Sequence, residues 1–407
     1  MAGDRTNHCP TARLPDCPTI AVRAPLRISF GGGGTDLEAY SARHGGFVVS
    51  TAIARYCHVV ADETADGGIR INSADYRLCE SFDLGAIPAV EEPLALPKAA
   101  LEWFATRGRS NGHGPGHDRH DAGVSLFLAS EVPPGTGLGS SSAMAVALLL
   151  ALTTRLGLTL DAAELAELAA WLEIERLEMP IGKQDQYASA FGGLNTIEFA
   201  AGGQGAVSVR PLGLRPDVLA ALNERLLLFA TGQSRHSAQI LRQQRADSGA
   251  DPAVVAALHR IKALAGEMCE ALLREDLDHF GRLLDLGWQQ KKRLSGRVSS
   301  TTIDDWYAAA REAGALGGKI TGAGGGGFLL LYCPPHAQGA VRAALSGLGL
   351  RELPFDFDRA GARVLAAGEA DPPAVPASLG QQWPISAHCG ELTPHDSRLT
   401  TTRGRQR

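Results

Sequence analysis

Residues 133–142 read PPGTGLGSSS, and this glycine-rich stretch lies between an expected strand at 124–130 and an expected apolar helix at 142–156. A glycine turn that leads into a helix presents backbone N–H groups and the positive end of the helix dipole to an anion. The serine hydroxyls suit either a helix cap or a magnesium ligand. The stretch therefore indicates a triphosphate site, with a plain capped turn as the alternative. It is not a Walker A loop, because no lysine follows the last glycine.

The composition excludes several classes of protein. The 407 residues carry 39 Lys+Arg against 44 Asp+Glu, a net charge of −5, which argues against a nucleic-acid binder. The longest apolar run, residues 143–152, is too short for a membrane helix. The 7 cysteines are scattered without a CxxC pair, so neither a disulfide framework nor a thiolate zinc site is indicated. We expect a cytoplasmic protein that binds neither nucleic acid nor membrane.

The hydrophobic pattern predicts an α+β fold, since strands and helices are mixed without the regular alternation of a Rossmann sheet. Expected strands are 20–30, 47–61, 124–130, 194–199, 226–230 and 328–332. Expected helices are 142–156, 162–178, 252–273, 277–294, 303–313 and 337–345. Glycine and proline at 213–217 indicate a boundary between two domains, which we expect at 20–213 and 214–368. The two ends of the sequence lack a hydrophobic period, so we expect a flexible extension at 1–19 and a disordered tail at 369–407.

A second glycine run, GGGGT at 31–35, breaks the first expected strand. Thr35 and Glu38 have the spacing of a capping box, which predicts a helix start with Asp36 in its first turn. A carboxylate held there can accept hydrogen bonds from sugar hydroxyls. The alternative is that Asp36 only complements the helix dipole.

A third run, KITGAGGGGF at 319–328, formally contains GxGxxG. A dinucleotide fold needs a helix after that loop, whereas residues 328–332 have the pattern of a buried strand. The Rossmann interpretation therefore fails. Either a glycine wall against a ligand or a tight interdomain turn remains.

The acidic segment 173–187 ends a helix at Pro180 and then places Lys183 two residues before Asp185. Glu164, Glu167 and Glu173 are expected on the polar side of that helix. A carboxylate beside a lysine suits a general base for phosphoryl transfer to a hydroxyl. A surface ion pair is the alternative.

Residues 106–123 contain His113, His117 and His120 together with two aspartates. Histidine and aspartate at short spacing are metal-ligand types. The glycine-rich surroundings offer no rigid scaffold for such a site, so a solvated loop is the favoured interpretation.

Together these segments resemble the GHMP kinase superfamily, and within it the D-glycero-D-manno-heptose 7-phosphate kinases. The resemblance is carried by PLRISFGGGGTDLEAY at 25–40, PIGKQDQYASAFGGLN at 180–195 and GGKITGAGGGGF at 317–328. It implies an N-terminal domain like ribosomal protein S5 domain 2 and a ferredoxin-like C-terminal domain. It also implies an ATP- and magnesium-dependent kinase that converts heptose 7-phosphate to the 1,7-bisphosphate for nucleotide-activated heptose synthesis.

The resemblance assigns catalytic roles position by position. Asp185 matches the catalytic aspartate, Arg27 the arginine beside it, and Lys183 would help to neutralise the transferring phosphoryl group. Ser141 is the first choice for a magnesium ligand and Ser140 the second, with Glu173 as acidic partner and Glu175 as its fallback. ATP would lie over Pro134, Gly135, Gly137, Leu138, Gly139, Ser140, Ser141 and Ser142.

The resemblance also implies the sugar site. Asp36 matches the sugar-binding aspartate, and its neighbours Gly33, Gly34 and Thr35 would contact the substrate. The loop 322–327, with Gly324 and Gly325, would close the site from the second domain. The substrate phosphate needs further cations, for which Arg235 and Lys319 are candidates, with Lys292 behind them.

Three other functions compete with this interpretation. A GHMP kinase acting on another sugar, such as fucose or galactose, would lack the second phosphate site. A non-catalytic sugar sensor would keep the fold without turnover, but the reactive residues argue against it. A nicotinamide-dependent oxidoreductase depends only on the formal GxGxxG.

Overall fold

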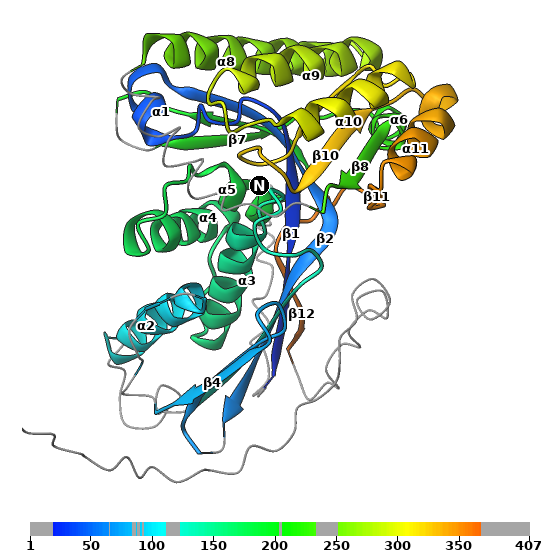
Figure 1. The fold of residues 1–407 in the computed structure, drawn as a ribbon. Coiled ribbons are helices and arrows are strands. Elements are labelled where there is room, and N and C mark those ends of the chain that lie inside the picture. Colours follow the sequence, from blue (N-terminus) through cyan, green and yellow to red (C-terminus); the bar gives the residue numbers. More distant parts are fainter. Residues whose placement is uncertain are drawn as a thin grey trace, which may run out of the picture. The chain divides into compact units, whose positions relative to one another are not determined.

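The computed structural model describes residues 19–367 except 65, 84–86, 88–89, 92, 111–122, 203–205 and 233–250 (Figure 1). Several expected features lie outside the described residues. These are residues 1–18 of the extension expected at 1–19, the tail at 369–407, the histidines of segment 106–123, and Arg235. Within the described part of the chain, every helix is too short or too polar to cross a membrane.

The larger sheet has 8 strands in the order β12-β1-β2-β5-β3-β4, with β6 paired to β2 and β7 to β6. The long strand β2 pairs with β6 through its first residues and with β5 through its last. The strands of the larger sheet are β1 (Ile20–Gly31), β2 (Gly46–Thr64), β3 (Ile69–Ser73), β4 (Leu78–Phe82), β5 (Gly123–Ser130), β6 (Leu194–Phe199), β7 (Val207–Pro211) and β12 (Arg363–Ala367). Because β12, the last strand of the described residues, pairs with β1, the chain returns there to the larger sheet. The division at residue 213 stays a prediction.

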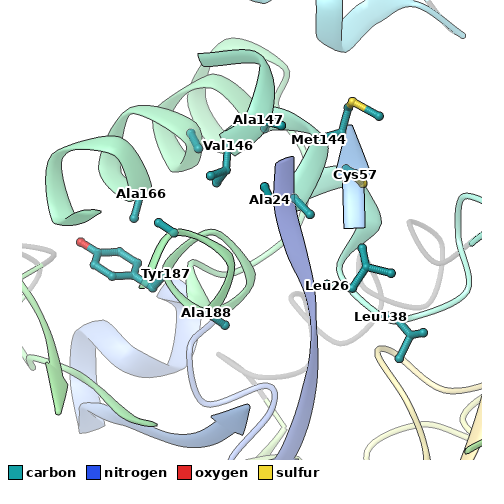
Figure 2. Packing of buried hydrophobic residues seen from close by; sticks show 14 of the residues in the cluster. Ala24, Leu26, Cys57, Leu138, Met144, Val146, Ala147, Ala166, Tyr187 and Ala188 are labelled. Atoms are coloured by element: carbon teal, nitrogen blue, oxygen red, sulfur yellow. The ribbon is translucent and has the colours of Figure 1, made fainter. Parts of the chain in front are cut away.

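Helices around α3 cover this sheet. Helix α3 packs on β1 and β2, and its alanines let the backbones approach closely. Figure 2 shows buried side chains of β1, α3, α4 and α5 meeting in this core, among them Ala24, Ala147 and Ala188. The helices of this part are α1 (Glu38–His44), α2 (Ala95–Ser110), α3 (Ser140–Arg155), α4 (Ala162–Ala170) and α5 (Gln184–Phe191).

The smaller sheet is antiparallel, in the order β11-β8-β10-β9, and has its own core around Trp288 and Tyr307. Helices α8 and α9 lie side by side (Figure 1). The strands of the smaller sheet are β8 (Leu226–Ala230), β9 (Gly317–Ile320), β10 (Phe328–Tyr332) and β11 (Arg351–Glu352). The remaining helices are α6 (Pro216–Glu224), α8 (Pro252–Leu273), α9 (Leu277–Lys292), α10 (Thr301–Glu312), the 3₁₀ turn Pro335–Ala337 and α11 (Gln338–Gly347). The two sheets, in which β3 and β5 form the one parallel pair among the described strands, confirm the α+β class. A strand after residue 327 confirms that the third glycine run is not a Rossmann loop.

Two helix starts differ from expectation. Helix α1 begins at Glu38 with Leu37 as its N-cap, so the capping box predicted from Thr35 is wrong. The Thr35 hydroxyl instead donates to the carbonyl of Gly32 and fixes the glycine turn. Helix α3 begins at Ser140, two residues earlier than expected, and Gly139 caps it in the left-handed region with φ 75°.

The acidic helix also differs. Asp161 caps it through a capping box with Glu164, but α4 ends at Ala170 and continues as a π-helix over Trp171–Arg176. A π-helix has a wider turn than an α-helix, and such segments occur often at functional sites. The wider turn changes which side chains face inward at this point of the chain.

Candidate active site

A cavity of about 840 Å³ brings the three glycine segments together. Gly33 and Gly34 come from the first segment, Gly135 and Gly137 from the second, and Gly322 from the third. The acidic and basic side chains that line the cavity, among the described residues, are Arg27, Asp36, Asp75, Glu173, Asp185, Lys291 and Lys319. Residues that are far apart in the sequence therefore form one site.

Arg27 and Asp185 form a two-point ion pair in the cavity. Arg27 Nε donates to Oδ1 of Asp185 at 2.7 Å and Nη2 donates to Oδ2 at 2.6 Å. A register shift between Pro25 and Leu26 bends β1 just before this arginine, as bulges next to sites often do. Asp185 lies in the first turn of α5, where the helix dipole favours a negative charge. The arginine fork thus holds the carboxylate in one orientation.

Asp36 lies next to this pair and is buried. Its Oδ1 accepts hydrogen bonds from the backbone N–H of Gly34 at 3.0 Å and from Nε2 of Gln184 at 2.9 Å. Burial, and then the charge of Asp185, raise the pKa of Asp36 to about 6. A Cβ on Gly182 would lie 2.1 Å from Oδ2 of Asp36, so glycine is required there. Asp36 is positioned by loop contacts, not by the helix turn expected for it.

Ser141 and Glu173 meet beside the start of α3. The Ser141 hydroxyl donates to Oε1 of Glu173 at 2.6 Å, and Gln186 Nε2 donates to Oε2 at 2.6 Å. Glu173 is fully buried, so its expected place on the polar side of the helix is wrong; the π-helix turns it inward. Burial raises the pKa of Glu173 to about 7. Glu175, the fallback, is not among the residues that line the cavity.

Lys183 does not join the site. Its ammonium pairs with Glu167 at 2.7 Å, and Glu167 also accepts a hydrogen bond from the Tyr187 hydroxyl. Lys183 is absent from the described residues that line the cavity. Lys183 therefore forms an ion pair with Glu167 of α4 in place of the expected contact with the phosphoryl group.

The second and third glycine loops pack backbone against backbone. A Cβ on Gly322 would lie 2.5 Å from Cα of Gly137, and the Thr321 hydroxyl donates to the Thr136 carbonyl at 3.2 Å. Arg27 Nη1 also donates to the Gly137 carbonyl at 2.7 Å. This hydrogen bond connects the second glycine loop to the ion pair of Arg27 and Asp185. The third loop thus closes on the second, and Gly322 and Ala323 reach the cavity.

Gly324 and Gly325 lie farther along the same loop. A Cβ on Gly324 would lie 2.8 Å from the Val298 carbonyl, and the Gly325 N–H donates to that carbonyl at 2.8 Å. Neither glycine is among the described residues that line the cavity. The structure places them against the chain after α9, not at the expected sugar position.

The expected phosphate-binding cations are placed differently from one another. Lys319 is buried at the cavity wall, where Nζ donates to the Ser29 carbonyl at 2.7 Å. Burial, and then the charge of Arg27, lower the pKa of Lys319 to about 7. Lys292 instead forms an ion pair with Asp304, with Nζ 3.3 Å from Oδ1. Lys292 is not among the described residues that line the cavity.

Two charged side chains that line the cavity have no role in the sequence analysis. Asp75 accepts a hydrogen bond from the Ser130 N–H at 3.0 Å, and burial raises its pKa to about 6. It lies in a turn between two short strands that have no strong pattern. Lys291, together with Trp288 and Lys292, belongs to the resemblance to the heptose kinases, but it is given no role there. Its charge lies on the apolar face of α9, three residues after Trp288, and that is the signal that could have assigned one.

Comparisons with known proteins identify the class. The family models described as GHMP kinases N terminal domain and GHMP kinases C terminal match residues 97–193 and 268–349. The D-glycero-alpha-D-manno-heptose 7-phosphate kinase of Campylobacter jejuni is 32% identical over 317 residues, covering 78% of this chain and 90% of the relative. The chain belongs to the GHMP kinase family and is an ATP-dependent kinase.

Two further likenesses point to sugar kinases. The L-fucokinase/L-fucose-1-P guanylyltransferase of Bacteroides fragilis is 31% identical over 342 residues, covering 80% of this chain and 36% of the relative. The crystal structure of a D-glycero-D-manno-heptose 1-phosphate kinase from Bacteroides thetaiotaomicron has a TM-score of 0.69 and 30% identity, covering 85% of this chain and 99% of that one. The expected two-domain GHMP kinase fold is confirmed, and the chain is a sugar kinase of that family.

Proposed function

We propose that this kinase transfers the terminal phosphoryl group of ATP to the anomeric hydroxyl of D-glycero-D-manno-heptose 7-phosphate. The product is the 1,7-bisphosphate, a precursor for nucleotide-activated heptose made in the cytoplasm. The observation that carries the proposal is Asp185, held by Arg27 beside Asp36 in a cavity that the glycine loops share. The names of the heptose kinases from Campylobacter and Bacteroides support the choice of sugar.

The chemistry assigns one role to each carboxylate of the sugar side. Asp185 orients the anomeric hydroxyl and takes its proton as the hydroxyl oxygen attacks the terminal phosphorus. The bond between that phosphorus and the bridging oxygen breaks, and ADP leaves. Asp36 accepts hydrogen bonds from the sugar hydroxyls, and the Arg27 fork keeps Asp185 aimed at the reacting oxygen.

Magnesium fits the pair formed by Ser141 and Glu173. Glu173 is buried without a cationic side chain among its described side-chain partners, which are Ser141, Ser142 and Gln186. A divalent cation would stabilise its charged form. Mg²⁺ usually takes one or two protein ligands and completes its shell with phosphates and water, so a small donor set suffices. Bound there, the ion would neutralise charge on the nucleotide phosphates.

The 7-phosphate of the substrate needs cations on the sugar side of the cavity. Lys319 meets this need, because its ammonium lies at the carbonyls of Ser29 and Phe30, directly before the first glycine run. Arg235 is kept as the second candidate. Arginine and lysine both pair with phosphate oxygens, and arginine does so at two points.

The test is ATP consumption by the purified protein against heptose 7-phosphate, mannose 6-phosphate, free heptose, fucose and galactose, with phosphorus NMR of each product. We expect an anomeric phosphate only on heptose 7-phosphate, and no turnover after EDTA treatment until magnesium is restored. Turnover of fucose, which the Bacteroides fragilis relative makes a second candidate, would overturn the heptose proposal and leave the sugar kinase standing. Full activity in EDTA would overturn the magnesium site.

A further inference from the structure

Lys291 is a buried cation that the proposed chemistry has not used. It lies in the last turn of α9 and is 8% exposed. Its Nζ donates to the carbonyls of Ile320, at 3.2 Å, and Gly322. No ion pair among the described residues joins Lys291 to a carboxylate. An ammonium has three N–H donors, so one remains for a ligand.

The position of Lys291 is at the phosphate end of the cavity. It lines the same cavity as Gly135, Ser140 and Ser141. Its acceptor Gly322 packs on Gly137, whose carbonyl accepts a hydrogen bond from Arg27. Lys291 thus reaches the glycine loops from the last turn of α9.

The surroundings of Lys291 favour an anionic partner for its charged form. Burial, and then the charges of Lys319 and Arg27, lower the pKa of Lys291 well below its usual range. A buried cation without a counter-charge is costly, and the negative end of α9 offsets only part of that cost. An anion brought into the cavity would restore the charged ammonium.

Two of the other candidates for this charge are paired with carboxylates, and the third, Lys319, binds other carbonyls of the cavity wall. Arg27 is bound at two points by Asp185, and Lys183 is paired with Glu167 behind the site. Lys319 faces the sugar side through the carbonyls of Ser29 and Phe30. Among the described residues, Lys291 is therefore the cation placed to meet a phosphate bound over residues 135–142.

We propose that Lys291 is a catalytic residue that binds the terminal phosphate of ATP and stabilises it during transfer. In the reaction, the ammonium donates a hydrogen bond to a non-bridging oxygen of the phosphoryl group and keeps its proton throughout. The role rests on the ATP-dependent kinase activity that the proposed function shares, but not on which sugar accepts the phosphate.

The first test measures nucleotide binding without sugar. Lys291→Met removes the charge and keeps the length of the side chain. Calorimetric titration with MgATP and MgADP should show at least tenfold weaker binding of ATP and less than twofold change for ADP, because only ATP carries the terminal phosphate. Lys292→Met is the matched control, since its ammonium pairs with Asp304 outside the cavity, and it should bind both nucleotides as the wild type does.

Two outcomes would overturn the role. Equal weakening of ATP and ADP in Lys291→Met would make the lysine a support of the loop. Unchanged binding of both nucleotides would remove it from the phosphate site. Thermal melting of the apoprotein checks folding, and Lys291→Gln replaces a variant that fails to fold.

Kinetics and proton counting give the second test. With whichever sugar the wild type accepts, Lys291→Met should lower kcat on the order of 10²- to 10³-fold, as loss of one electrostatic donor does elsewhere, and leave KM for the sugar within twofold. ATP titrations in buffers of different ionisation enthalpy should show proton uptake in the wild type and less in the variant, because burial lowers the pKa of Lys291 in the free protein. A change confined to KM for the sugar would move Lys291 to the substrate phosphate and overturn the proposal.

Discussion

The two walls of the cavity carry opposite charges that are satisfied in different ways. On the wall built by β1, α3, α5 and the π-helix, Asp36, Glu173 and Asp185 each accept hydrogen bonds from neighbouring side chains. On the wall built by α9 and β9, Lys291 and Lys319 bind only backbone carbonyls among their described partners. The first wall is organised before any ligand arrives. The second lacks its anions, which the phosphates of the two substrates would supply.

This difference predicts the largest effect for Asp185→Asn. The amide keeps the shape of the side chain and loses the charge that Arg27 binds and the proton acceptor for the hydroxyl. We expect kcat to fall about 10²- to 10⁴-fold, the usual contribution of a general base, while MgATP still binds. Steady-state kinetics and nucleotide titration measure the two effects.

The matched control for that variant is Asp305→Asn on the exposed side of α10. It should leave both kcat and nucleotide binding at wild-type values. If Asp185→Asn kept nearly the full rate, the chemistry would have to lie elsewhere, and the first wall would be only a binding surface.

Gly182→Ala tests how rigidly the first wall is built. The new methyl group would lie 2.1 Å from Oδ2 of Asp36, so the carboxylate or the loop must move. We expect the free energy of unfolding to fall by about 1–3 kcal/mol, as for other overpacked sites, and KM for the sugar to rise while KM for ATP stays constant. Urea unfolding and sugar titrations at saturating ATP measure these effects.

Gly266→Ala in α8 is the control, because a Cβ there meets nothing within 4 Å. A helical glycine replaced by alanine should stabilise the protein by up to about 1 kcal/mol and leave both KM values unchanged. A Gly182→Ala variant as stable as the wild type, with unchanged KM for the sugar, would mean that Asp36 is not held by this contact.

The predictable part of the molecule is the part in which local sequence decides the structure. The apolar run after Ser142 and the alternating residues of β1 and β2 predict buried elements that the structure contains. The glycine runs mark the loops of the cavity because a backbone approaches another backbone there, as Gly137 and Gly322 do. Short elements such as β3, β4 and β12 were missed, since a few residues paired across the chain carry little local pattern.

The site residues divide in the same way. Arg27 and Asp185 were expected together, and the structure joins them over 158 positions. The orientation of Lys183 was not predictable, because it depends on Glu167 one helix earlier and not on its neighbour Asp185. Glu173 was placed on the wrong face because spacing assumes an α-helix, and the π-helix over Trp171–Arg176 changes the turn. Tertiary packing decided these positions.

The last expected effect is a pH dependence of stability that belongs to the second wall. Lys319 has a pKa of about 7 in the folded protein against 10.5 for the free side chain, because it is buried beside Arg27. Between these values the unfolded chain binds more protons, so the contribution of Lys319 to the free energy of unfolding rises with pH from about 7 to 10.5. One proton limits this slope to about 1.4 kcal/mol per pH unit.

Comparison of the wild type with Lys319→Met isolates that contribution, because the variant has no proton to lose at this position. The difference in unfolding free energy, wild type minus variant, should increase between pH 7 and 9 in urea titrations, whereas Lys292→Met should differ from the wild type by a constant. Saturating sugar phosphate should flatten the difference, since an anion at Lys319 raises its pKa toward the unfolded value. A difference that does not change with pH would mean that Lys319 keeps its charge without a ligand. The two walls would then differ only in where their charged side chains lie, and the second wall would not need an anion to hold its charge.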